Sequence, residues 1–144
     1  MAGMRDHSKL RAFQLADQLV VRVYEQTRSF PREELFGLTS QLRRAAVSIA
    51  SNIVEGSARL SKADYIRMLS IGYGSCKEVE YQLSLAQRLG FLNQERYQEV
   101  GSLAKETGKV LSGLIHALRR PNHRPDILNP QPRADTRSGS MSSI

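Results

Sequence analysis

Apolar residues recur at intervals of three and four along most of the chain, the spacing that places side chains on one face of an α-helix. Four segments carry this pattern, at residues 8–28, 38–55, 62–89 and 94–120. The connections after the second and third segments are short, so the helices that they join are expected to run antiparallel. The pattern predicts an all-α protein, an up-down-up-down antiparallel four-helix bundle.

Polar residues and glycines mark the expected helix ends. Ser8, Ser61 and Asn93 are suited to cap helix N-termini, because their side chains accept hydrogen bonds from free backbone amides. Gly56 and Gly90 are suited to the left-handed conformation that follows many helices. These residues predict where the helices begin and end.

The second and fourth segments carry more apolar residues than one buried face requires. In the second segment the core stripe consists of Leu38, Leu42, Ala45, Ala46, Ile49 and Ile53. An adjoining strip consists of Val47, Ala50 and Val54. The fourth segment has a second strip of its own, made of Leu103, Thr107, Val110 and Leu114. This surplus predicts self-association or a protein partner.

Two glycines, Gly72 and Gly74, lie inside the third predicted helix. A glycine in a helix interior costs up to about 1 kcal/mol relative to alanine. We expect the cost to be offset by the close approach of a neighbouring helix or subunit.

A chain of 144 residues fits one domain with a core of its own. We expect a disordered N-terminus at residues 1–7, the bundle at residues 8–120 and a mobile tail at residues 121–144. The tail is rich in proline and serine, a composition typical of segments without a packed core. Within it, Ile127 and Leu128 are expected to provide a weak docking anchor.

The chain is basic, with 21 Lys and Arg against 14 Asp and Glu, a formal charge of +7 and an isoelectric point near 10.0. Such a charge favours anionic partners, nucleic acid first, because contacts with phosphates release condensed counterions. The basic residues are dispersed along the sequence, however. A solvated surface that is incidentally basic is the alternative interpretation.

The single cysteine, Cys76, excludes an internal disulfide and falls on an apolar helical face. It is interpreted as a buried apolar residue in a reducing compartment. The sequence has no signal-peptide core and no apolar run long enough to span a membrane. These features predict a cytoplasmic protein with no membrane partner.

The sequence contains no set of residues that indicates a particular reaction. The three histidines, His7, His116 and His123, lack neighbours at metal-ligand spacing, so no metal and no cofactor is expected. There is no phosphate-binding glycine loop, and neither a serine nor Cys76 has the sequence context of a catalytic nucleophile. The protein is predicted not to be an enzyme.

Glu80 falls at the edge of the apolar stripe of the third helix. A carboxylate in that position needs a donor, because burying an unpaired charge is costly. Arg43 is a candidate partner, and tyrosine hydroxyls and Asn52 are others. The expected role of Glu80 is an ion pair that fixes the helix register.

Several of these residues also carry a family resemblance. Phe30-Pro31 with residues 34–56, then Gly74-Ser75 with residues 78–80, then residues 85–92 resemble the bacterial four-helix-bundle proteins, also called 23S rRNA intervening-sequence proteins. The resemblance covers about residues 8–119, and the block that begins at Phe36 is its most specific part. The chain departs from the family pattern, which usually has tryptophan near Phe13, alanine at Val54 and glycine at Ala58.

The resemblance implies a homopentamer of bundles. Some family members are encoded within insertions of ribosomal RNA genes, which describes their location and not their activity. The chain is also similar, more distantly, to the accessory protein of diversity-generating retroelements, a basic pentamer that binds a reverse transcriptase and nucleic acid.

Together, the pattern, the charge and the resemblance predict a homo-oligomer, with five subunits implied by the family. Its basic surface is expected to bind RNA or DNA, alone or within a ribonucleoprotein, and a nucleic-acid-processing protein is a further candidate partner. The candidate phosphate contacts lie around the turn between the second and third helices and are Arg43, Arg44, Arg59, Lys62 and Arg67. The alternative is a protein-interaction scaffold that uses an exposed apolar strip. Aromatic stacking platforms are not apparent, so binding is expected to be electrostatic and tolerant of sequence.

Overall fold

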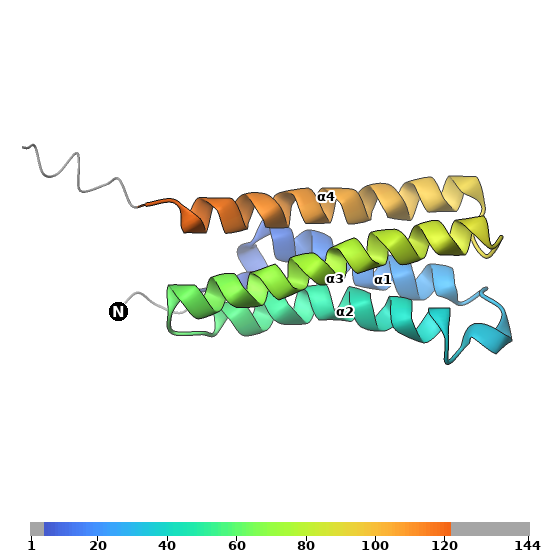
Figure 1. The fold of residues 1–144 in the computed structure, drawn as a ribbon, viewed down its shortest axis with the longest axis horizontal. Helices are drawn as coiled ribbons and strands as arrows, with labels where there is room; N and C mark the ends of the chain where they lie inside the picture. The colour runs from blue at the N-terminus through green and yellow to red at the C-terminus, as the bar shows by residue number, and fades with distance from the viewer. Residues whose placement is uncertain (1–4, 122–144) are drawn as a thin grey trace, which may run out of the picture.

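The computed structural model describes residues 5–121, which form four long α-helices. The helices are α1 (Arg11–Thr27), α2 (Leu38–Ser57), α3 (Lys62–Arg88) and α4 (Gln94–Arg119), and two short 3-10 helices are η1 (His7–Lys9) and η2 (Arg32–Glu34). Successive helices run in opposite directions (Figure 1). The predicted up-down-up-down antiparallel four-helix bundle is confirmed.

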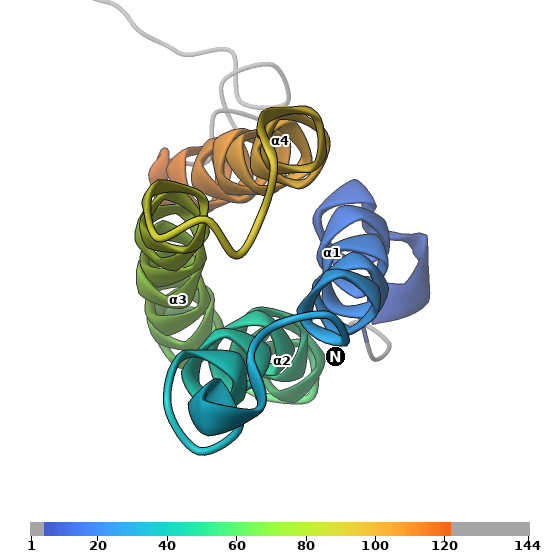
Figure 2. The same ribbon diagram turned by 90° about the vertical axis from the view of Figure 1, so that its right-hand side faces the viewer.

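The helices surround a single core, each packing on two neighbours in the order α1, α2, α3, α4 and back to α1 (Figure 2). The largest side chains buried completely within it are Leu19, Leu42, Ile49, Ile53, Leu69, Leu83 and Leu111. They come from all four helices. Apolar residues at a spacing of three and four in each helix therefore bury one stripe apiece against the other three.

The caps that begin α3 and α4 and the turn that follows α3 agree with the sequence prediction. Ser61 accepts a hydrogen bond from the amide of Asp64 at 3.0 Å, and Asn93 accepts one from the amide of Arg96 at 2.8 Å. Gly90 has a φ of +82° after α3, a conformation that costs glycine little. These local signals fix the ends of α3 and the start of α4.

The predicted start of the first helix at Ser8 is wrong. Asp6 caps η1 instead, since its carboxylate accepts hydrogen bonds from the Ser8 amide and hydroxyl. The chain then turns at Leu10, and α1 begins at Arg11 without a side-chain cap. The reason is that Asp6, two residues earlier, binds the Ser8 amide and hydroxyl and so uses Ser8 in its own cap.

Gly56 is not a residue that follows α2, as predicted, but lies inside it. A Cβ atom at this position would come within 3.0 Å of the Met68 Cβ and 3.2 Å of the Tyr65 ring in α3. Gly56 is therefore required for the close packing of two helices and not for a left-handed turn. Gly72 also faces the neighbouring helix, but less tightly, because a Cβ there would meet the Ile49 carbonyl and the Asn52 Cβ at 3.4 Å, the beginning of ordinary van der Waals contact.

Gly56→Ala is expected to destabilise the protein by roughly 1–3 kcal/mol, because the added methyl group overpacks the contact with α3. The matched control is Gly113→Ala in α4, where a Cβ would meet nothing within 4 Å. That change should stabilise the fold by up to about 1 kcal/mol through helix propensity alone. Urea denaturation of both variants checks the prediction, and a Gly56→Ala protein as stable as the control would contradict it.

The predicted terminal segments are described by the structure only in part. Residues 1–4 and the predicted mobile tail beyond Pro121, with Ile127 and Leu128, lie outside the described residues. Arg5 is described and contacts the bundle. Within residues 5–121, no helix is both long and apolar enough to cross a membrane.

Candidate nucleic-acid interface

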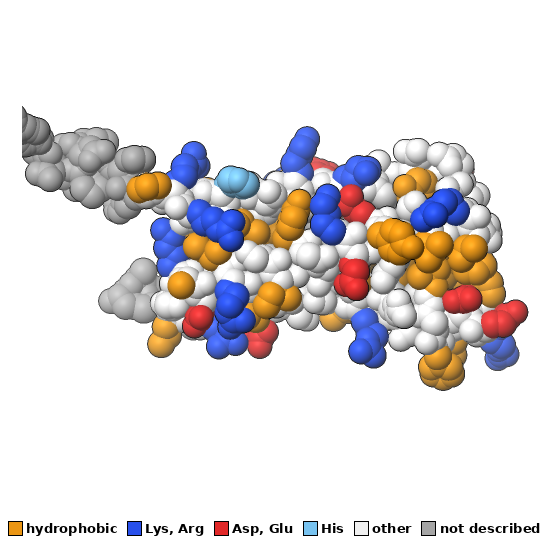
Figure 3. Space-filling view, viewed as in Figure 1, with side chains coloured by type: hydrophobic (Ala, Val, Ile, Leu, Met, Phe, Trp, Pro, Cys, Tyr) orange, Lys and Arg blue, Asp and Glu red, His pale blue; other side chains and the backbone are white. Residues whose placement is uncertain are grey.

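One end of the bundle brings together basic residues from three distant parts of the sequence. The up-down order of the helices places the first described residues, the α2–α3 turn and the end of α4 side by side (Figure 1). We call this surface the basic end and define it by Arg5, Arg59, Lys62, Arg67, Arg119 and Arg120. In the space-filling view, several Lys and Arg side chains lie at this end, and others are spread along the same face (Figure 3).

The α2–α3 turn holds its side chains on a rigid backbone. After α2, the amides of Ala58 and Arg59 donate to the carbonyls of Glu55 and Gly56, and the Ser61 cap begins α3. The intervening Leu60 side chain is 90% exposed. Because these hydrogen bonds already order the backbone, a ligand that binds at the turn loses little backbone entropy.

Arg5 is held against this turn by two contacts. Its Nη1 donates to the Arg59 carbonyl at 2.7 Å, and its guanidinium lies 4.2 Å from the centre of the Tyr65 ring. Burial raises the pKa of the Tyr65 phenol, so the ring stays neutral and offers its negative face to the cation. A residue 54 positions away in sequence thereby becomes part of the site.

Three of the cations that sequence analysis proposed lie at the basic end. Arg59 approaches Glu55 at 3.8 Å, but both side chains are well exposed, at 41% and 61%. An exposed pair of this kind is weak, so Arg59 remains available to an anion. Lys62 and Arg67 are also exposed on the first turns of α3.

Arg43 and Arg44 do not lie around this turn, which corrects the sequence prediction of their position. They precede the end of α2 by 13 or more residues, about 20 Å along the helix axis. Arg43 points toward α1, where its Nε donates to Thr27 Oγ1 at 2.8 Å and its guanidinium lies 4.5 Å from the Tyr24 ring. Arg44 lines a groove between α2 and α3.

Sequence reasoning missed Arg5, Arg119 and Arg120. The signal for them was the predicted topology itself, because an antiparallel bundle with an even number of helices brings both chain ends to one side. Three acidic residues, Asp6, Glu55 and Asp64, lie among the cations or next to them in sequence. Asp6 is engaged in the η1 cap, where hydrogen bonds from Ser8 lower the pKa of its carboxyl.

The predicted ion pair of Glu80 exists, but its partner is not Arg43. The Glu80 carboxylate lies 3.4 Å from Lys77 Nζ and 3.8 Å from Lys105 Nζ, and its side chain is 18% exposed. Arg43 lies on the α1 side of α2 and is engaged by Thr27 and Tyr24. The pair with Lys105 links α3 to α4, as expected of a residue that fixes helix register.

Cys76 is buried, as predicted, and its Sγ donates to the Ala104 carbonyl at 3.2 Å. Burial, together with the neighbouring charge of Glu80, raises the pKa of the thiol to about 11. The thiol is therefore protonated at neutral pH, and the thiolate is the reactive form. Across residues 5–121, no group of three or more His, Cys, Asp and Glu side chains is placed to hold a metal ion.

The fold and this surface define a class: a small antiparallel four-helix-bundle protein with a cation-rich end. The model of the 23S rRNA-intervening sequence protein family matches residues 8–113. The chain belongs to this family. Its more distant similarity to the retroelement accessory protein stays a prediction.

A solved structure shares the fold closely. It is a protein of unknown function from the S23 ribosomal protein family of Bacteroides thetaiotaomicron, with a TM-score of 0.66 and 27% sequence identity. The similarity covers 72% of the present chain and 97% of the other. No curated protein gives a significant match to the chain.

Proposed function

We propose that this protein is a homo-oligomer, with five subunits as the family resemblance implies, that binds RNA or DNA through its basic end without catalysing a reaction. The observation that carries the proposal is the convergence of Arg5, Arg59, Lys62, Arg67, Arg119 and Arg120 on one end of the bundle. In an oligomer with rotational symmetry, copies of this surface add their electric fields. A modest cluster in one subunit then becomes a strong anion site.

The chemistry of the site favours phosphate contacts over the reading of bases. Its exposed groups are guanidinium and ammonium groups, which pair with phosphate oxygens. The ring of Tyr65 is 3% exposed and already occupied by Arg5, so it does not serve as a stacking platform. Binding is therefore expected to be electrostatic and tolerant of sequence.

The absence of catalysis belongs to the same proposal. The chain's one thiol is buried and protonated at neutral pH, which does not favour a nucleophilic role for it. A protein that processes nucleic acid is a further candidate partner. The nucleic acid bound to such a protein exposes phosphates that the basic end could contact.

A titration of RNA binding with salt tests the proposal. The dissociation constant of a fluorescent single-stranded RNA, followed by anisotropy, should rise steeply between about 50 and 200 mM salt. A matched DNA strand and a duplex of each type measure the preference. Absence of binding to all four at low salt would reject the proposed function.

The second candidate function is a protein-interaction scaffold, and exposed apolar residues at the opposite end favour it. Phe36 is 92% exposed in the α1–α2 connection, beside Leu35 at 49%. Leu89, at 55%, follows α3 at the same end. Binding through these residues should barely respond to salt, which distinguishes the scaffold from a phosphate-binding surface.

A further inference from the structure

The outward faces of α2 and α3 carry a pattern that their own subunit does not use. Residues at alternating intervals of three and four line each face, as they do along the seam between two packed helices. Along α2 and its C-terminal cap the series is Arg44, Val47, Ser51, Val54 and Ala58, and in α3 it is Arg67, Ile71, Gly74, Glu78 and Tyr81. Its large apolar members are exposed to 37% at Val47, 38% at Val54, 45% at Ile71 and 60% at Tyr81.

Gly74 lies within the α3 series and has no role inside the subunit. A Cβ atom at Gly74 would meet nothing within 4 Å, whereas one at Gly56 or Gly72 would meet the neighbouring helix. A glycine in a helix interior costs about 1 kcal/mol, and no contact among the described residues offsets that cost. Gly113 in α4 is equally open, so open space alone marks no contact. Gly74 differs because it lies in the same series as the exposed Ile71 and Tyr81, where a neighbour that approaches from outside would offset the cost.

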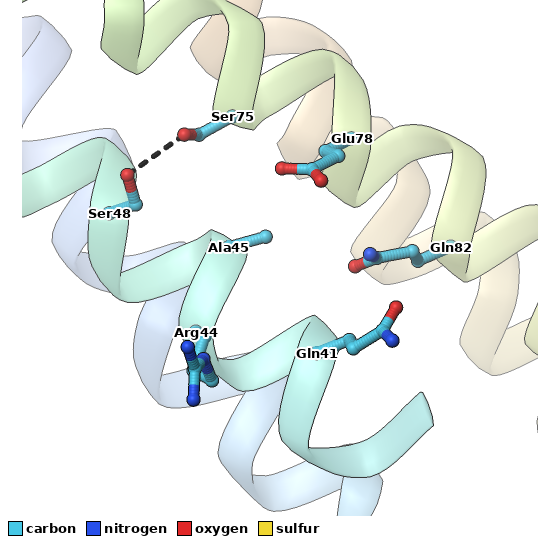
Figure 4. A pocket seen from close by; sticks show the side chains of 7 residues that line it. All are labelled: Gln41, Arg44, Ala45, Ser48, Ser75, Glu78 and Gln82. Atoms are coloured by element: carbon cyan, nitrogen blue, oxygen red, sulfur yellow. Dashed lines mark hydrogen bonds between the residues drawn. The ribbon is translucent and has the colours of Figure 1, made fainter. Parts of the chain in front are cut away.

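A polar groove runs between the two series. It is lined by Gln41, Arg44, Ala45, Ser48, Ser75, Glu78 and Gln82. Ser48 and Ser75 bridge it with a hydrogen bond of 2.8 Å, and Ala45 leaves room between the helices. Figure 4 shows Gln41 and Gln82 facing one another across the groove, with Glu78 reaching over it from α3.

Arg44 lines the groove as well, but two of the groove's acceptors have no partner among residues 5–121. Glu78 has no cation within ion-pair distance among residues 5–121. Gln82 is only 6% exposed, and its Oε1 has no hydrogen-bond partner among the same residues. A buried acceptor left unbonded costs about 1–3 kcal/mol. The complementary group is one that carries positive charge and several N–H donors, namely a guanidinium or an ammonium group.

We infer that a second copy of this chain docks on the outward face of α2 and α3 and places an arginine or lysine side chain in this groove, beside Glu78 and Gln82. The chain supplies such side chains in excess, with 21 basic residues against 14 acidic. Exposed apolar residues such as Val47 and Tyr81 flank the polar groove, and a docked protein surface would cover them and exclude water from the ion pair, which a small free cation would not do. The inference rests on the homo-oligomer in the proposed function and assigns its contact surface.

Charge reversal in the groove tests the inference. Glu78→Lys fills the groove with a cation of its own and repels the incoming one, so the association constant between subunits should fall by about tenfold or more. Glu78→Gln should weaken assembly less. Asp17→Lys is the control, because Asp17 is an exposed helical acid on α1 with no ion pair among the described residues. Light scattering over a range of concentrations measures the mass of each protein.

A cysteine label gives a second measurement that does not depend on charge. Because the chain has one cysteine and it is buried, Ser51→Cys adds the single reactive thiol. Its reaction with a maleimide should slow at concentrations where the protein is assembled and recover on dilution. Thermal unfolding of the diluted variants confirms that each is folded.

The outcomes separate this inference from the proposed function. An oligomer whose mass is unchanged by Glu78→Lys, or a Ser51→Cys thiol that reacts equally fast at all concentrations, would overturn the inference while leaving the oligomer intact. A wild-type protein that stays monomeric would overturn both. Loss of assembly in Glu78→Lys and not in Asp17→Lys would support the inference, whether or not RNA binds at the basic end.

Discussion

Replacing Arg59, Lys62 and Arg67 together by glutamine is expected to weaken RNA binding by about 100-fold at about 0.1 M salt. The estimate assumes that each residue contacts one phosphate of a single strand. Each contact then contributes about 0.7 to the slope of log K against log salt, so the slope should also fall by about 2. Fluorescence anisotropy over a series of salt concentrations measures both quantities.

The control for this variant removes the same charge from the other end of the bundle. Arg28, Arg32 and Arg96 are exposed and lie near the α1–α2 and α3–α4 connections. Their replacement by glutamine lowers the net charge equally but should change the affinity and the salt slope only slightly. Equal losses in the two triple variants would mean that net charge, and not the basic end, attracts the nucleic acid.

Leu69→Ala is expected to lower the free energy of unfolding by roughly 3–5 kcal/mol. Leu69 is completely buried in α3 and belongs to the core shared by all four helices. Removing its side chain loses transfer free energy and leaves a cavity that the surrounding helices fill only in part. Since domains of this size are stable by about 5–15 kcal/mol, the loss is a large fraction of the total.

Leu89→Ala provides the comparison, because it is the same chemical change at a different burial. Leu89 is 55% exposed after the end of α3, so truncating it should change the stability by less than about 0.5 kcal/mol. Urea denaturation of both variants, with an unchanged m-value, gives the two free energies. A Leu69→Ala protein as stable as Leu89→Ala would contradict the position of the core.

Local sequence signals predicted the architecture because a helix in a small bundle is defined by its own periodicity and caps. The stripe of α3 that includes Leu69 and Val79 is buried as expected, and Ser61, Asn93 and Gly90 act at the ends where they were expected. These features require only the residues within a few positions of each site. Short connections then determine the antiparallel order.

Contacts between helices could not be derived in the same way. Periodicity gives the angle of a side chain about its helix axis but not the distance to the neighbouring helix, so the need for a glycine at position 56 was assigned to a turn. Arg43 and Arg44 are adjacent in sequence, yet they project about 100° apart. One is therefore engaged by α1, and the other lines the α2–α3 groove.

The basic end illustrates the same limit on a larger scale. Arg59, Lys62 and Arg67 are close in sequence and were recognised as a group. Arg5 enters through a contact with the Arg59 carbonyl and the Tyr65 ring, and the end of α4 enters through the direction of the fourth helix (Figure 1). Only the assembled bundle brings these segments together.

Cross-linking of bound RNA to the protein by ultraviolet light, followed by mass spectrometry of the peptides, tests the central claim most directly. We expect attachment to peptides that include the α2–α3 turn, the residues around Arg5 and the end of α4. Attachment concentrated on the α1–α2 and α3–α4 connections, at the opposite end of the bundle, would contradict binding at the basic end.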